Sequence, residues 1–184
     1  MEAVNKQSRF HFLKEVTNSI LLQKFSLFVK DFIEEEGWYL RPEAVKSRGW
    51  EIIPVEKGRH LEPAEIAILV KGLVKHGYRK CYAPMFIEKI GDDPDCLEVP
   101  VTEEGLDEFS RKLAGINIPL ISEDCSFILL FTSEEWNLYA GQKSFIEDVL
   151  GKTIKEARAE FDEFASDPYW EGRLEKLANR YKFL

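Results

Sequence analysis

The sequence predicts an α+β fold, with a central, mostly antiparallel sheet of four to five strands and helices at the N- and C-terminal ends. Apolar residues recur at helical spacing near both ends of the chain, whereas several short strand-like segments fill its middle. Helices and strands do not alternate strictly, as they would in a doubly wound sheet. We expect residues 1–184 to form one domain in which the polar residues 1–9 are frayed.

The first predicted helix starts near Phe10, and its apolar stripe runs to Phe32. Thr17 or Asn18 could cap a second segment, so the stripe predicts either one helix or two. Gly37 would end this region, because glycine accepts the positive φ angle of a helix C-terminus. Five later helices are predicted from Pro63 to Gly77, after Thr102 to Gly115, over 143–150 before Gly151, after Thr153, and over 169–181.

The most distinct strand is the continuous apolar run Ser126–Thr132, which predicts burial on both faces. Trp136–Ala140 follows a short acidic turn and is the expected antiparallel partner. Two other segments contain a proline, which should place Pro54 at a sheet edge or strand end and Pro84 at an edge or bulge. The remaining strand-like segments are Arg48–Val55, Lys80–Glu88, Cys96–Val101 and Ile116–Ile121.

The chain is acidic, with a net charge of -8 and a pI of about 5.1. Nucleic-acid binding is therefore disfavoured, since it needs cations to neutralise phosphates. The charge is uneven: residues 41–80 hold nine Lys or Arg against five Glu, which gives +4 there and -12 elsewhere. This division could set the choice of partner, or could be a chance distribution of surface charge.

Neither a secretory signal nor an apolar run long enough to span a bilayer is found, so we expect a cytoplasmic protein that does not enter membranes. Cys81, Cys96 and Cys125 are widely spaced and form no CxxC pair. Cys81 and Cys125 lie in apolar runs, which favours buried thiols in a reducing compartment.

The known signatures of catalysis and cofactor binding are missing, so the sequence predicts neither a cofactor nor a metal site. Gly141-Gln142-Lys143-Ser144 lacks the glycines of a phosphate loop. His60 precedes Glu62 and Glu65, which are more simply first-turn acids of a helix, and the acidic turn 92–98 lacks calcium-loop spacing. The sequence marks no cysteine as activated and has no nucleophile elbow, so we lean towards a protein that is not an enzyme.

Two hypotheses remain. The first is an acidic, non-enzymatic interaction or regulatory protein, such as an inhibitor or an immunity protein, that binds a basic protein partner. Trp136 and Tyr139, on a short strand beside acidic residues, are its candidate contact residues because Trp and Tyr are frequent binding hot spots. A homo-oligomer is left open.

The alternative hypothesis is a small enzyme or small-molecule binder whose site is assembled from dispersed residues. The basic stretch 41–80 could then supply an anion subsite. The residues to inspect are Arg48, Arg59, His60 and Lys71.

Overall fold

The computed structural model describes residues 10–35, 38–56, 58, 60–87 and 93–182. Its strands are β1 (Lys14–Glu15), β2 (Glu51–Glu56), β3 (Lys80–Pro84), β4 (Cys96–Pro100), β5 (Ile118–Ile121), β6 (Phe127–Phe131) and β7 (Trp136–Gly141). Its helices are α1 (Ser19–Phe32), α2 (Pro42–Ser47), α3 (Pro63–Lys75), α4 (Glu103–Lys112), α5 (Lys143–Leu150), α6 (Ile154–Ala165) and α7 (Arg173–Tyr181), with a 3-10 turn η1 at Pro168–Trp170.

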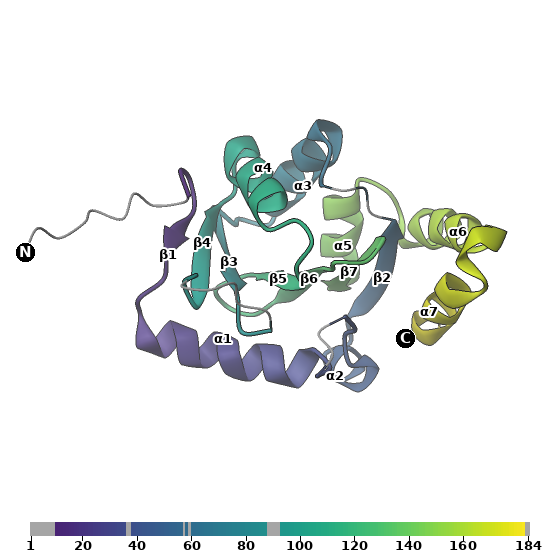
Figure 1. The fold of residues 1–184 in the computed structure, drawn as a ribbon, viewed down its shortest axis with the longest axis horizontal. Coiled ribbons are helices and arrows are strands. Elements are labelled where there is room, and N and C mark those ends of the chain that lie inside the picture. Colours follow the sequence, from purple (N-terminus) through teal and green to yellow (C-terminus); the bar gives the residue numbers. More distant parts are fainter. Residues whose placement is uncertain (1–9, 36–37, 57, 59, 88–92, 183–184) are drawn as a thin grey trace, which may run out of the picture.

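The strands form one sheet in the order β1-β4-β3-β5-β6-β7-β2, and every neighbouring pair is antiparallel (Figure 1). The predicted α+β class and antiparallel sheet are therefore confirmed, but the sheet has seven strands instead of four to five. The prediction missed β1, which has two residues and lies within the segment expected to be helical. A strand this short carries too little alternation to be detected from sequence.

Helices cover both faces of the sheet (Figure 1). Residues of α3, α4 and α5 share one hydrophobic cluster with one face of the strands, and residues of α1 and α2 share the second cluster with the other face. The helices predicted from Pro63 and after Thr102 are confirmed as α3 and α4, which lie between strands in the sequence in addition to the helices at the two ends of the chain. Gly72 of α3 lies so close to α5 that an added Cβ would stand 2.7 Å from backbone atoms of Asp148 and Val149.

Strand β2 forms one edge of the sheet, as Pro54 predicted. It is paired along its whole length with β7, from Glu51 opposite Gly141 to Glu56 opposite Trp136. Its other side packs against α6 and α7, which lie beyond it at the end of the sheet in Figure 1. Cover of this kind protects an edge strand from pairing with other chains.

The position of Pro84 was predicted wrongly. Strand β3 lies inside the sheet, between β4 and β5. Pro84 is its last residue, opposite Cys96, so the missing N–H falls where the ladder ends.

The capping residues were predicted well, because capping is a local interaction. Thr102 accepts a hydrogen bond from the Gly105 N–H, and Thr153 accepts one from the Glu156 N–H. Gly151 follows α5 with a φ of 67°. Of the two candidates at the N-terminus, Asn18 is the cap, and α1 begins after it.

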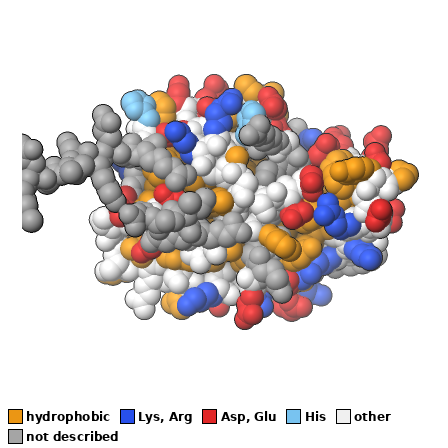
Figure 2. Space-filling view, in the orientation of Figure 1, with side chains coloured by type: hydrophobic (Ala, Val, Ile, Leu, Met, Phe, Trp, Pro, Cys, Tyr) orange, Lys and Arg blue, Asp and Glu red, His pale blue; other side chains and the backbone are white. Residues whose placement is uncertain are grey.

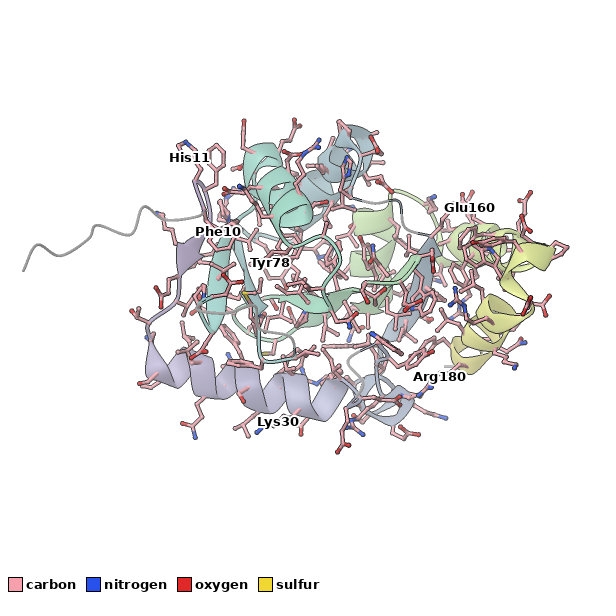
Figure 3. All side chains as sticks on the ribbon, viewed as in Figure 1. Phe10, His11, Lys30, Tyr78, Glu160 and Arg180 are labelled. Atoms are coloured by element: carbon pink, nitrogen blue, oxygen red, sulfur yellow. The ribbon has the colours of Figure 1, made fainter. Side chains whose placement is uncertain are left out.

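Residues 10–17 precede α1 and are not helical, contrary to the prediction from Phe10. A single carboxylate on α4 holds this segment in place. Glu108 accepts hydrogen bonds from the backbone N–H groups of His11 (2.6 Å), Phe12 (2.6 Å) and Leu13 (3.1 Å). The predicted helical stripe failed here because these bonds, and the burial of Leu13, favour an extended segment beside α4 (Figure 3).

The Glu108 anchor gives the first testable expectation. In Glu108→Ala the amides of His11, Phe12 and Leu13 lose their acceptor, so their hydrogen exchange accelerates and the free energy of unfolding falls by about 1 kcal/mol. Exchange measured by mass spectrometry and urea unfolding check this. Glu104→Ala, an exposed glutamate on the same helix, is the control. Unchanged exchange at residues 11–13 would contradict the anchor.

The same anchor has a pH dependence. Burial raises the pKa of Glu108, but the three backbone N–H bonds and His11 outweigh it and hold the pKa below the ordinary value. The stabilisation is therefore present above the unfolded carboxyl pKa and is lost as the pH falls through the folded one.

Candidate functional site

The two aromatic residues proposed as contact residues do not form one platform. Trp136 and Tyr139 are three residues apart on β7, and side chains alternate between the faces of a strand. Trp136 therefore packs in the cluster with α1 and α2, whereas Tyr139 packs in the cluster with α3, α4 and α5. Their side chains are 2% and 5% exposed, so neither offers a contact surface of any size.

Arg48 lies at the end of α2 and is held in place by aromatic rings. Its guanidinium carbon stands 5.3, 5.2 and 5.0 Å from the ring centres of Phe28, Phe32 and Trp50. One of its N–H groups also donates to the Cys125 carbonyl, at 2.8 Å. The contacts give this cation a defined place on the α1–α2 face.

The other basic candidates lie elsewhere. Lys71 is an exposed residue of α3, on the opposite face of the sheet from Arg48. Arg59 is outside the described residues. The structure therefore does not bring Arg48 and Lys71 together, although both belong to the basic stretch 41–80.

His60 lines a different hollow from the one beside Arg48 and helix α1. This loop hollow has a volume of about 760 Å³, within the range of ligand pockets. It lies between the β2–α3 loop, the C-terminal end of α4 and the β6–β7 turn. Its lining residues are Gly58, His60, Arg111, Ala114, Gly115, Ser133, Glu134 and Glu135.

Two buried polar side chains hold the rims of the loop hollow. Ser110 of α4 accepts a hydrogen bond from the Leu61 N–H, at 2.6 Å, and so ties the β2–α3 loop to α4. Asn117, before β5, accepts one from the Ser133 N–H at 2.9 Å and ties down the β6–β7 turn. Ser110 and Asn117 are 8% and 1% exposed, so water cannot easily replace these bonds.

Charges of both signs face the loop hollow. The Nε atom of Arg111 is bonded to Asp107, one turn earlier on α4, at 2.7 Å. Across the hollow, Glu134 and Glu135 both pair with Arg173 of α7, at 3.5 and 3.2 Å. The hollow therefore joins a cationic rim on α4 to an acidic rim on the β6–β7 turn.

A second hollow adjoins the first, and Gly58 lines both. This acidic groove, of about 350 Å³, is defined by Glu56 at the end of β2, Glu62 and Glu65 at the start of α3, and Glu160 on α6. Among the residues that the structure describes, Lys152 is the one cation in its lining, and it is paired with Glu160. Apolar groups complete the lining: Pro54, Val55, Leu150, Ala157 and Phe161.

One carboxylate of the groove, that of Glu65, is held by a hydrogen bond and lies close to a buried tyrosine. Glu65 accepts a hydrogen bond from the Glu62 N–H at 2.7 Å, which caps α3. Burial raises the pKa of Tyr139, and the negative charge of Glu65 raises it further. The Tyr139 side chain is therefore buried close to Glu65, at the start of α3.

The cysteines are buried thiols. Cys81, Cys96 and Cys125 are all free and are at most 5% exposed. Burial raises the pKa of the Cys81 thiol far above its ordinary value and that of Cys96 to about 12. The thiolate is the nucleophilic form, so both side chains behave as small hydrophobic residues. Within the described residues, no group of His, Cys, Asp and Glu is arranged to hold a metal ion.

In the part of the chain that the structure describes, no helix has the length and apolar character needed to cross a membrane. Comparisons with known protein families, curated proteins and solved structures found no match to this chain.

The sequence analysis did not identify Arg111 as a site residue. It also did not predict that the four glutamates of the groove lie together. Glu56 and Glu160 are separated by more than half of the chain, and only the packing of α6 against β2 brings them to one groove. Proline at the start of α3 did mark Glu62 and Glu65 as neighbours of a helix N-terminus. The sequence carried no signal that a strand end and α6 would join them.

The anchors of the loop hollow can be tested by mutation. In Asn117→Ala the Ser133 N–H loses its buried acceptor, which costs about 1–3 kcal/mol of unfolding free energy and loosens the β6–β7 turn. Urea unfolding and hydrogen exchange at Ser133 measure both effects. Asn179→Ala, at an exposed site on α7, should change neither. Native exchange at Ser133 in the Asn117 variant would show that the bond is not an anchor.

Proposed function

We propose that this chain is a cytoplasmic, non-enzymatic interaction module, of the kind found in inhibitors or immunity proteins, whose acidic groove binds a Lys- or Arg-rich segment of a partner protein. The groove itself is the observation that carries the proposal. Glu56, Glu62, Glu65 and Glu160 converge there from three elements around a hollow of about 350 Å³.

Charge favours a cationic occupant. The described residues of the groove include four carboxylates and one lysine, so an excess of three negative charges remains once Lys152 pairs with Glu160. Glu134 and Glu135 stand on the rim of the adjoining loop hollow, where they share one cation, Arg173, so the excess of acidic groups continues past Gly58. The whole chain has a net charge of -8, which would steer a basic partner towards it.

The shape of the lining also suits lysine and arginine. Both side chains have a methylene stem that packs on apolar surface while the charged end stays among polar groups. The groove offers Val55, Ala157 and Phe161 beside its carboxylates. An inorganic cation or a simple amine would leave this apolar part of the groove uncovered.

Figure 2 shows acidic and basic side chains interspersed over the α6–α7 end of the molecule. This end of the molecule therefore has no uniform acidic surface to which a basic partner could bind by overall charge alone. The free thiols of the three cysteines support a reducing compartment for this interaction.

The groove is tested with a fluorescent decalysine peptide. The double variant Glu56→Gln, Glu160→Gln removes two groove carboxylates and should weaken binding at low salt by about three- to tenfold, since exposed charge pairs contribute about 0.2–1 kcal/mol each. The matched control Glu15→Gln, Glu163→Gln changes the net charge equally, at exposed sites outside the groove. It should weaken binding by less than about twofold.

Fluorescence anisotropy at two salt concentrations measures the difference. Equal losses in both double variants would mean that the peptide responds to net charge alone, and the groove would be rejected as the site. A binding constant that does not change with salt would reject the electrostatic basis of the proposal.

The loop hollow supports a second candidate function, the binding of a small ligand. Its volume of about 760 Å³ and its two rims of opposite charge favour a molecule that carries both a carboxylate and an ammonium group. Arg111 and His60 would contact the carboxylate, and Glu134 and Glu135 the ammonium group. This candidate keeps the binding role of His60 but does not use Arg48 or Lys71.

A thermal-shift series tests this candidate. Amino acids and dipeptides should raise the melting temperature, because a ligand that binds only the native state stabilises it. Matched compounds that lack either the amine or the carboxylate should raise it less, and Arg111→Gln should abolish the difference between them. If no compound of the series raises the melting temperature, the small-ligand function is rejected. The proposal that the acidic groove binds a basic segment is not affected by that result.

A further inference from the structure

Helix α1 carries exposed apolar residues on the side that faces away from the sheet. Ile20 is 77% exposed and Leu27 is 58% exposed, whereas Phe25, Phe28 and Phe32 of the same helix are buried. Ile20 and Leu27 are seven residues apart, which is two helical turns, so they lie on one stripe. Figure 1 shows α1 along the outer side of the fold, and in Figure 3 Lys30 of this helix points away from the sheet.

A hollow of about 470 Å³ lies beside this stripe. One of its walls is α1, and the other is formed by Arg48, Asp124 and Cys125. The wall is rigid, because Arg48 is stacked on aromatic rings and bonded to the Cys125 carbonyl. The exposed apolar stripe therefore borders a fixed recess that can receive side chains from another molecule.

Two opposite charges frame Leu27 on the same stripe. Lys24 precedes it by three residues and Asp31 follows it by four, and both line the hollow. The Lys24 ammonium donates to the Glu123 carbonyl, at 2.5 Å, and has two further N–H groups to donate. Among the described residues, Asp31 has no ion-pair partner. The midpoint of the two charges falls between Leu27 and Phe28, so a reversed second copy centred there sets each Lys24 opposite an Asp31 and keeps the two Leu27 side chains close to the axis.

We propose that this stripe pairs with the same stripe of a second copy of the chain, in an antiparallel arrangement about a two-fold axis near Leu27. Leu27 then packs on Leu27 of the partner subunit. Lys24 meets Asp31 of the partner subunit, and by symmetry this ion pair forms twice.

Charge excludes the other simple arrangements. A parallel pair would place Lys24 against Lys24 of the partner subunit and Asp31 against Asp31 of the partner subunit, and like charges in contact are destabilising. An antiparallel pair centred between Gln23 and Lys24 would match Ile20 with Leu27 of the partner subunit, but it would bring the two Lys24 side chains together. Of these arrangements, only the register centred between Leu27 and Phe28 joins contact between the Leu27 side chains with opposite charges.

The test is sedimentation equilibrium over about 10–500 µM protein, the range in which a small helix pair would associate. The wild-type chain should dimerise, and Leu27→Glu should raise the dissociation constant at least about tenfold by placing two carboxylates at the axis. Ile68→Glu, at an exposed apolar residue of α3 on the opposite face of the sheet, should leave it unchanged.

Charge exchange tests the register. Lys24→Glu and Asp31→Lys should each weaken the dimer, because each sets like charges against each other twice. The double variant should restore it. An equimolar mixture of the two single variants should form a heterodimer, because both ion pairs are then rebuilt between unlike chains.

A wild-type chain that is monomeric throughout this range would overturn the proposal. A dimer that Leu27→Glu leaves intact would also overturn it, since the interface would lie elsewhere. Single charge variants that dimerise like the wild type would overturn the antiparallel register. Circular dichroism melting curves of each variant identify any that fail to fold, and the heterodimer mixture then decides the register with folded chains. The proposal does not depend on the acidic groove, which shares no lining residue with α1.

Discussion

The pairing of β2 with β7 is the constraint on which the rest of the structure depends. It joins a strand from the first third of the chain to one from the last third, along six residue pairs. The register decides which side of β2 each residue faces: Ile53 packs towards α3, and Ile52 packs towards α1 and α2. It also places the end of β2 beside the β6–β7 turn, since Glu56 is opposite Trp136. Both hollows at Gly58 follow from this one alignment.

The sequence predicted the local features well and the long-range ones poorly, for a physical reason. Helix caps such as Thr102 and Thr153 act within one turn, and the run over β6 is apolar because both faces are buried, so residues nearby in sequence carry these signals. Strand β1 depends instead on pairing with β4 and on the Glu108 anchor, contributed by residues about 80 to 100 positions away. No local pattern encodes such partners.

For the candidate site residues, too, the sequence predicted some placements and not others. The alternation of side chains along a strand already implied that Trp136 and Tyr139 face opposite sides, because they are three residues apart. No comparable pattern in the sequence predicts that the basic residues of the stretch 41–80 lie on different faces of the sheet. Arg48 and Lys71 are separated by a strand, a loop and part of a helix, and the chain passes between them from one face of the sheet to the other. The basic residues of the stretch 41–80 are therefore divided between the two faces of the sheet, with Arg48 on one side and Lys71 on the other.

The two proposed surfaces have a joint consequence that neither has alone. The acidic groove lies where β2, α3 and α6 meet, whereas the dimer stripe lies on α1, in the helical layer on the other face of the sheet. A two-fold pairing through α1 would leave both grooves open and would hold two of them in one particle. A partner with two basic segments could then bind both grooves, and the second binding event would become intramolecular. Modest affinity at each groove, as expected for exposed charge pairs, would be converted into tight binding without any new contact. Dimerisation would thus select for partners with repeated or closely spaced basic segments over partners with only one.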